Sequence, residues 1–341
     1  MDWLPTLWFI LIALLWTGYL FLEGFDLGIG MQIGLGRGGE KHKRVLLNTI
    51  GPVWDGNEVW LLTAGGATFA AFPYWYASLF SALYIPLTLV LVALIFRAVA
   101  IEYRGKAQNA TTRGLWDLAL GWGSLIAAFG VGAMLALTTL GLPLNENGDR
   151  VGGPFAWFTW HAVLGGVAVV AFSWIHSVAF LRLKTEGPIR VSSGQRFIRW
   201  MPWCVVPLLL WSAVVVLAGT SLAAWTLLVL AVVAAFFAWF SARAGHEGRS
   251  FIALGIMLVG AVAAIFVAAF PVVLPSTINS TFDLTIYNAS SSPYTLKLMS
   301  IVAAFGVPLV LAYQSWSYWV FRKRIGEKHI PEDHLVTSAV K

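Results

Sequence analysis

The sequence is poor in charge and has a single cysteine. Charged residues make up 11% of its 341 positions, whereas hydrophobic residues make up 59% and the mean hydropathy is +0.77. A soluble domain needs more polar surface than this to face water, so the composition excludes the soluble class and indicates an integral membrane protein. The lone Cys204 excludes an internal disulfide and any thiolate metal cluster formed within the chain.

Long apolar runs dominate what is present. Six have the ~20-residue length that a bilayer core requires, and splitting longer stretches at turn signals raises the number to nine. We therefore predict an all-α fold, a polytopic membrane protein with about nine transmembrane helices arranged as helical bundles plus a peripheral helix. The predicted spans are residues 4–22 (with an extension to 35), 55–72, 77–101, 114–140, 156–182, 199–218, 222–241, 250–270 and 297–321. The first run lacks the basic leader of a signal peptide, so we expect it to be retained as a helix.

Basic residues are distributed on one side of these spans. Of the 22 Lys and Arg, 20 fall in the odd-numbered loops, their helix ends and the C-terminal segment, which leaves only Arg150 and Lys297 elsewhere. The positive-inside rule then places the N-terminus outside and the C-terminus in the cytoplasm. We expect one transmembrane domain at 1–321 and a basic cytoplasmic tail at 322–341. Since the membrane accounts for the net charge of +6, no nucleic-acid partner is expected.

Four acids lie in or beside the apolar segments: Glu23, Asp26, Asp55 and Glu58. An Asp at the centre of a membrane helix costs about 2.5–3.5 kcal/mol, so such acids indicate a proton or ion route. Each pair is spaced three residues apart, which puts it on one helical face. Both pairs fall at the same depth near the cytoplasmic face, so we predict that the four carboxylates form a proton entry there.

A structural role for the acids is the alternative. Asp55 and Asn57 stand at a helix start, where either could cap backbone N–H groups, and Arg97 could neutralise a carboxylate. Asp117 is interpreted as a cap at the start of the fourth span. The first acidic pair is mid-helix, so a structural role would require buried partners for it.

Glycines recur near the acids, and two interpretations remain open. Small residues four positions apart allow close helix packing, but glycines could also loosen the first helix so that carbonyl groups and water solvate the acids. The glycines are Gly24, Gly28, Gly30, Gly34 and Gly36, with the pairs Gly65-Gly66 and Gly165-Gly166 elsewhere. A Ser/Thr/Asn/Pro-rich outer loop at 271–296 suits an ordered cap or a partner contact, and a plain solvated loop is an equally good interpretation.

Two segments, residues 24–28 (GFDLG) and 54–61 (WDGNEVWL), resemble signatures of subunit II of the cytochrome bd family of quinol oxidases. The similarity continues in order through 63–67, 96–97, 102–104, 270–271, 275–276 and the ninth span, and so covers most of the chain. The longer motif is the specific one, because Gly-Phe-Asp alone is short.

The resemblance implies a multi-pass subunit of the bacterial cytoplasmic membrane. Its partner would be a homologously folded subunit I that carries haem b and haem d, oxidises quinol and reduces O2 to water. The resemblance also implies that Asp55 belongs to a proton path along the subunit interface, and we expect Trp54, Asn57 and Arg97 to support that site. Some relatives hold a structural quinone in this subunit; the sequence leaves open whether this chain does, and whether a small accessory subunit is present.

We expect no haem in this chain itself. Only His161 and His176 fall on a predicted span, and their 15-residue separation, about 22 Å along a helix, prevents both from ligating one haem. Ligation by His with Met134 or Met257 remains open. The alternative function is a proton- or cation-coupled secondary transporter, since acids beside glycine-broken helices also mark such sites. The absence of an apparent inverted repeat and the clustering of the acids near one face favour the oxidase subunit.

Overall fold

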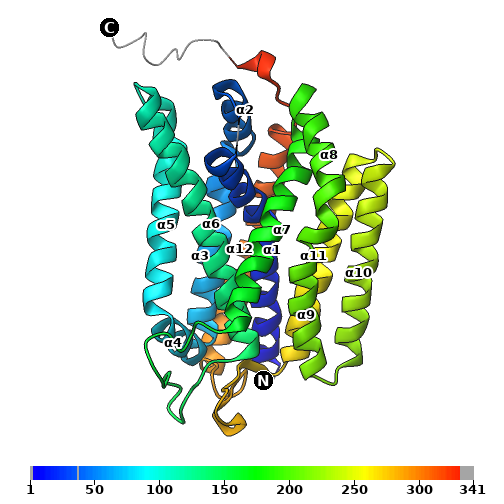
Figure 1. The fold of residues 1–341 in the computed structure, drawn as a ribbon. Coiled ribbons are helices and arrows are strands. Elements are labelled where there is room, and N and C mark those ends of the chain that lie inside the picture. Colours follow the sequence, from blue (N-terminus) through cyan, green and yellow to red (C-terminus); the bar gives the residue numbers. More distant parts are fainter. Residues whose placement is uncertain (1–2, 37, 331–341) are drawn as a thin grey trace.

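The computed structural model describes residues 3–36 and 38–330, which form a bundle of long helices (Figure 1). In chain order the helices are α1 (Leu4–Leu35), α2 (Glu40–Ile50), α3 (Trp54–Ala71), α4 (Pro73–Ala82), α5 (Tyr84–Tyr103), α6 (Ala110–Leu140), α7 (Trp160–Lys184), α8 (Gly187–Cys204), α9 (Val206–Ala218), α10 (Leu222–Arg243), α11 (Glu247–Ala269) and α12 (Pro293–Val320). Short 3-10 turns occur at η1 (Arg104–Lys106), η2 (Ser280–Phe282) and η3 (Glu327–His329). The predicted all-α, multi-pass fold is confirmed.

Eight segments of the described chain are long and apolar enough to cross a membrane. They correspond to α1, α5 with η1, α6, α7, α8 with α9, α10, α11 and α12. The remaining predicted span, 55–72, forms α3, which packs against α1 and leaves its other face exposed. Because Asp55, Asn57 and Glu58 occupy its first turns, α3 is less apolar than the other eight.

Packing of α1, α6 and α7 forms the centre of the bundle, and glycines allow these helices to approach closely. A Cβ atom at Gly28 would overlap the carbonyl oxygen of Ser173 on α7, and one at Gly34 would overlap that of Asp117 on α6. Helix α1 runs unbroken through its glycines, so close packing is the correct interpretation there and loosening of the helix is wrong. For Gly65 and Gly66 on α3, nothing in the described chain lies within 4 Å of an added Cβ atom, so close packing at these two positions stays a prediction.

Several boundaries differ from the sequence-based prediction. The span predicted at 199–218 begins at Gly187, because α8 continues past the apolar run into a segment containing Arg190 and Arg196. The span predicted at 77–101 divides into α4 and α5 at Leu83. Helix α2 was not predicted; it is too short and polar to span, and it buries Val45, Leu46 and Ile50 against the bundle. Helix α2 and the start of α8 were missed because the length of an apolar run does not predict helices made of polar residues.

The segment 271–296 is an ordered cap over one end of the bundle. It contains β1 (Val272–Leu274) and β2 (Leu284–Thr285), which pair antiparallel. Its Ser276 hydroxyl donates a 2.7 Å hydrogen bond to the Leu144 carbonyl beyond the end of α6. This cap lies at the opposite end of the bundle from α2 (Figure 1).

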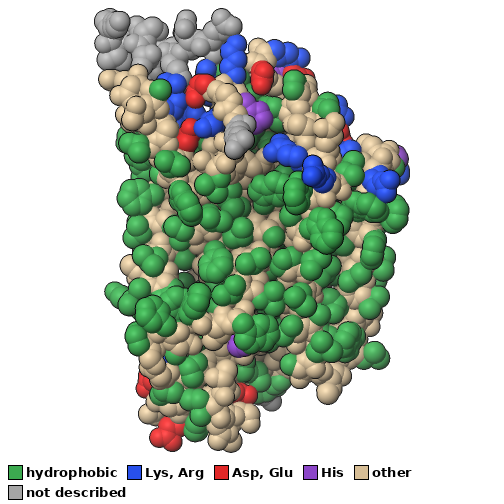
Figure 2. Space-filling model, viewed as in Figure 1, with side chains coloured by type: hydrophobic (Ala, Val, Ile, Leu, Met, Phe, Trp, Pro, Cys, Tyr) green, Lys and Arg blue, Asp and Glu red, His purple; other side chains and the backbone are tan. Residues whose placement is uncertain are grey.

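Lysine and arginine side chains gather at the end of the molecule that carries α2 and the start of α8, above a broad hydrophobic band (Figure 2). We call this the basic end. Its assignment to the cytoplasm rests on the charge rule and stays a prediction, as do the domain limits. Of the predicted tail at 322–341, residues 331–341 lie outside the described residues. The described part pairs with the chain between α7 and α8, where Ile325 donates a backbone hydrogen bond to Lys184 and Lys328 lies 2.9 Å from Glu186.

Candidate functional site

Arg97 of α5 stands at the centre of a buried group of acids. Its Nη2 lies 2.6 Å from Glu23 Oε1 on α1, and both side chains are fully buried. Its Nη1 donates a 3.2 Å hydrogen bond to Glu58 Oε2 on α3. The predicted neutralisation of a carboxylate by Arg97 is thus confirmed for Glu23 and Glu58, and one guanidinium joins three helices.

Asn57 links this group to α12. Its fully buried side chain donates a 2.6 Å hydrogen bond from Nδ2 to Asp26 Oδ2. Its Oδ1 accepts hydrogen bonds from Gln314 Nε2 at 2.9 Å and from the Tyr318 hydroxyl at 2.8 Å. Gln314 also accepts a 2.8 Å hydrogen bond from Trp60 Nε1. The structure therefore brings Glu23, Asp26, Asn57, Glu58 and Arg97 together, and we call these five residues the acid cluster.

Asp55 is not part of the acid cluster, although it lies one turn from Glu58 on α3. Its side chain is exposed, and among the described residues it makes no hydrogen bond or ion pair. The capping interpretation of Asp55 and Asn57 is wrong, because the N-cap of α3 is Val53 and no side chain caps it. Trp54 is half-buried against the apolar residues beside α1 and α2.

Charge in the acid cluster is unbalanced. Three carboxyl groups face one guanidinium, and Asp26 Oδ1 has no hydrogen-bond donor among the described residues. Uncompensated charge in a buried, low-dielectric site is costly. An arrangement of this kind is suited to binding and releasing a proton, since Asp26 Oδ1 and Glu23 Oε2 both lack a hydrogen-bond donor among the described residues and the neighbouring charges are close enough to respond to each other.

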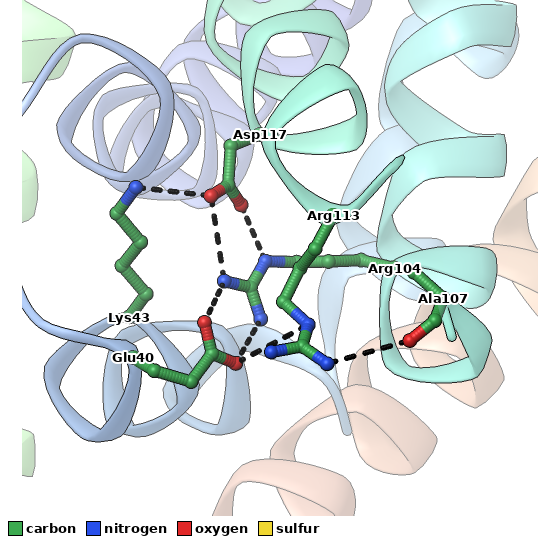
Figure 3. Close-up of polar contacts among 6 residues, drawn as sticks. All are labelled: Glu40, Lys43, Arg104, Ala107, Arg113 and Asp117. Carbon is green, nitrogen blue, oxygen red and sulfur yellow. Dashed lines mark hydrogen bonds and ion pairs between the residues drawn. The ribbon is translucent and has the colours of Figure 1, made fainter. Parts of the chain in front are cut away.

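A second polar group at the basic end was missed by the sequence reasoning. Figure 3 shows the Arg104 guanidinium between two acids. It donates to both oxygens of Glu40 at 3.0 and 2.9 Å, and its Nε donates to Asp117. Lys43 Nζ completes the group 2.9 Å from Asp117 Oδ2, and Arg113 Nε lies 3.9 Å from Glu40.

This second group corrects the interpretation of Asp117 as a helix cap. Helix α6 begins two turns earlier, and its N-cap is Asn109, whose side chain accepts from the Thr112 amide. Partial burial by itself would raise the pKa of the Glu40 carboxyl, but hydrogen bonds from Arg104 outweigh it and hold that pKa below its ordinary value. The group could not be predicted because its Glu40 and Lys43 lie on α2, whose helix and docking position were not foreseen.

The two histidines of the predicted fifth span lie in different surroundings. His176 is fully buried, with its ring centroid 5.0–5.6 Å from those of Phe21, Phe25, Phe172 and Phe251. His161 is half-buried, and its Nδ1 lies 3.2 Å from the Thr159 hydroxyl. Within residues 3–36 and 38–330, no group of three or more His, Cys, Asp or Glu side chains is placed to hold a metal ion.

Comparison with known proteins places the chain in a family. Residues 4–321 match the family model described as cytochrome bd terminal oxidase subunit II. The chain belongs to this family. It is 40% identical over 333 residues to the cytochrome bd ubiquinol oxidase subunit 2 of Bacillus subtilis, covering 95% of this chain and 98% of that one. It is 30% identical to the cytochrome bd-I ubiquinol oxidase subunit 2 of Escherichia coli K12, covering 95% and 96%.

The fold agrees with this assignment. The structure of bd oxidase from Geobacillus thermodenitrificans contains a chain that superposes with a TM-score of 0.76 at 18% sequence identity, covering 94% of this chain and 99% of that one. The protein is accordingly a subunit of a quinol oxidase and a multi-pass protein of the bacterial inner membrane. As a subunit II it has a subunit I partner in a haem-containing complex, and nothing in these comparisons favours the transporter alternative.

Proposed function

We propose that this subunit delivers protons to the oxygen-reducing centre of its complex through Asp55 and the acid cluster. In this proposal Asp55 receives protons at the subunit surface, and Glu58, Asp26 and Glu23 relay them or hold them in reserve. Haem b and haem d are carried by subunit I, where quinol is oxidised and O2 is reduced to water, and this chain carries neither.

One observation carries the proposal. The cluster holds the fully buried carboxyl groups of Glu23 and Asp26 and the partly exposed one of Glu58 against a single guanidinium. Asp55, one turn from Glu58, is exposed and has no counter-ion among the described residues. A group of acids with purely structural roles would be expected to have each charge matched. Here Arg97 matches Glu23 and Glu58, whereas Asp26 is held only by the Asn57 amide.

The face that subunit I would cover is defined by α3, α5 and α12. Only 6% of the most apolar stretch of α12 is buried, and large side chains such as Phe305 (77% exposed) and Leu309 (73% exposed) project from it. Added Cβ atoms at Gly66 on α3 and Gly306 on α12 would meet open space, so these positions could accept a neighbour's side chains. An obligate interface on this face would bury on the order of 2,000 Å² or more.

Replacement of Asp55 by asparagine tests the proton role. Asp55→Asn keeps the shape and most hydrogen bonding of the side chain but cannot titrate. In the purified complex we expect quinol-driven O2 consumption per haem d to fall by about 10²-fold, the lower range for loss of a positioned proton-transfer group. Asp26→Asn should lower the same rate, whereas Asp149→Asn, which removes an exposed acid at the other end of the bundle, should not.

The amount of complex distinguishes this role from a structural one. If Asp55→Asn turns over at the wild-type rate per haem d while less complex assembles, the acid is a structural partner of the other subunit and the proton role is wrong. Full spectroscopic haem d content with slow turnover is the expected result.

A further inference from the structure

The basic end contains a cavity of about 470 Å³ with a cationic lining. Arg196 of α8, with His42 and Lys43 of α2, lines it, and no Asp or Glu does. The cavity lies on the α1, α6, α7 and α8 side of the bundle, and none of α3, α5 and α12 contributes to it. It is therefore distinct from both the acid cluster and the face assigned to subunit I.

Arg196 has no carboxylate partner in the described part of the chain. Its Nη1 donates a 2.8 Å hydrogen bond to Gln32 Oε1, and its Nη2 lies 3.3 Å from the Ser193 hydroxyl. Its Nε has no acceptor among the described residues. Within the described chain, both hydrogen-bond partners of this guanidinium are thus neutral groups. A half-buried guanidinium without a counter-ion favours an anion in the adjoining space, and its planar donor set suits a phosphate group.

Lys43 adds to this excess of positive charge. It lies 2.9 Å from Asp117, but Asp117 is shared with Arg104. The group drawn in Figure 3 contains three basic side chains and two acids, so Asp117 does not cancel the charge that Lys43 brings to the cavity.

An apolar groove continues from the cationic cavity into the hydrophobic band. Leu125, Val170 and Ala171 line both the cavity and a second space of about 530 Å³ between α5, α6 and α7. The lining of this second space is almost wholly apolar and reaches Leu137 on α6. Leu125 and Leu137 are twelve positions apart, which is about 18 Å of helix and close to the ~15 Å of one leaflet of a bilayer core.

We propose that this composite site binds one anionic glycerophospholipid. Arg196 and Lys43 contact its phosphate, and an acyl chain passes Ala171 into the apolar groove. A charged head attached to an apolar chain of leaflet length matches the order of the two spaces, and basic pockets between membrane helices select anionic lipid headgroups. A quinone has a similar shape, but its neutral head offers Arg196 no counter-charge.

The purified complex in detergent provides the test. Phosphatidylglycerol retained per haem d after extensive washing is measured by mass spectrometry for wild type, Arg196→Gln and Arg199→Gln. Arg199 lies one turn along α8, is exposed and stacks over Trp200, so its loss removes the same charge outside the cavity. We expect Arg196→Gln to reduce retention of this lipid at least about fivefold and Arg199→Gln to leave it unchanged.

A second variant separates the headgroup from the chain and remains informative if Arg196→Gln does not assemble. Ala171→Phe narrows the junction of the two spaces and leaves every charge in place, so it should also lower lipid retention. Added phosphatidylglycerol should raise the melting temperature of lipid-depleted wild-type complex, whereas phosphatidylcholine or inorganic phosphate should not.

Four outcomes at the headgroup end of the site, and a fifth at the chain end, would overturn the proposal. The first four are lipid retention in Arg196→Gln equal to that of wild type, a loss of lipid in Arg199→Gln equal to that in Arg196→Gln, stabilisation by inorganic phosphate equal to that by phosphatidylglycerol, and a quinone as the molecule lost from Arg196→Gln. Unchanged retention in Ala171→Phe would show that the apolar groove holds no chain, and it would overturn the composite site as well.

Discussion

Arg97 on α5 and Glu23 on α1 form a fully buried ion pair, with Nη2 and Oε1 2.6 Å apart. Each charge is stabilised by the other and not by water, because neither side chain is exposed to solvent. The pair fixes the position of the remaining acids, since Glu58 shares the same guanidinium and Asp26 lies one turn from Glu23 on α1.

Replacement of Arg97 by glutamine should therefore impair assembly more than catalysis. Breaking a buried pair by removing one partner costs about 3–5 kcal/mol, because the other charge is left uncompensated. We expect Arg97→Gln to lower the amount of haem d-containing complex per total subunit protein severalfold, measured in membranes by absorbance and immunoblot.

Glu58→Gln is the matched comparison for assembly. Glu58 is partly exposed, with 18% of its side chain accessible, and its removal leaves the Arg97–Glu23 pair intact. We expect nearly normal assembly of this variant. Equal amounts of complex for Arg97→Gln and wild type would contradict the structural importance of the pair.

The sequence predicted the buried acids better than it predicted their partners. Glu23 and Asp26 interrupt an apolar run at a three-residue spacing, so their cost and their common helical face were visible without a structure. The participation of Gln314 and Tyr318 was not, because they reach Asn57 from more than 250 residues away through the packing of α12. The exposure of Asp55 was not predicted either, because it depends on how α3 packs. The three-residue spacing paired Asp55 with Glu58, but the packed helix leaves Asp55 exposed.

Helix existence was likewise predictable where apolar length is decisive. The bilayer requires ~20 apolar residues per span, which fixed most helices. The same reasoning missed α2 and the first part of α8, where polar residues are helical outside the apolar runs. The ion-paired group around Arg104 was not predicted because Glu40 and Lys43 lie on α2, which was itself not predicted.

Close packing of α1 on α7 makes Gly28 intolerant of any side chain. An added methyl group would overlap the Ser173 carbonyl oxygen, which belongs to a helix backbone and cannot rotate away. Gly28→Ala should cost about 1–3 kcal/mol through helix displacement and lower the melting temperature of the purified complex. Gly248→Ala on α11, where an added Cβ meets open space, is the control and should leave the melting temperature unchanged. A Gly28→Ala complex as stable as wild type would show that α1 and α7 can separate freely.

Acidification should weaken the attachment of α2. Since Arg104 holds the pKa of Glu40 below its ordinary value of 4.5, the ion pair contributes its full stabilisation above that value. The contribution is lost as the pH falls through the lowered pKa, where the folded state takes up the proton. Glu40 is partly exposed, so the contribution is below about 1 kcal/mol. We expect Glu40→Gln to be less heat-stable than wild type at pH 7 and the difference to vanish near or below about pH 4. If Glu40→Gln is still less heat-stable than wild type in acid, the loss of stability is due to altered packing and not to the ion pair.

Asn57 should be the most sensitive position that carries no charge. It donates to Asp26 and accepts from Gln314 and Tyr318, so Asn57→Ala leaves three polar groups without their partner. Each unsatisfied buried group costs about 1–3 kcal/mol, whereas Tyr318→Phe removes a single hydrogen bond and should cost about 1 kcal/mol. Because the Tyr318 hydroxyl bonds only to Asn57 among the described residues, Asn57→Ala with Tyr318→Phe should be scarcely less stable than Asn57→Ala alone. The melting temperatures of the three variants form a double-mutant cycle that measures this coupling. Additive effects would mean that the hydrogen bond between Asn57 and Tyr318 does not stabilise the assembled protein and that α12 is held to α3 by other contacts, such as those of Gln314.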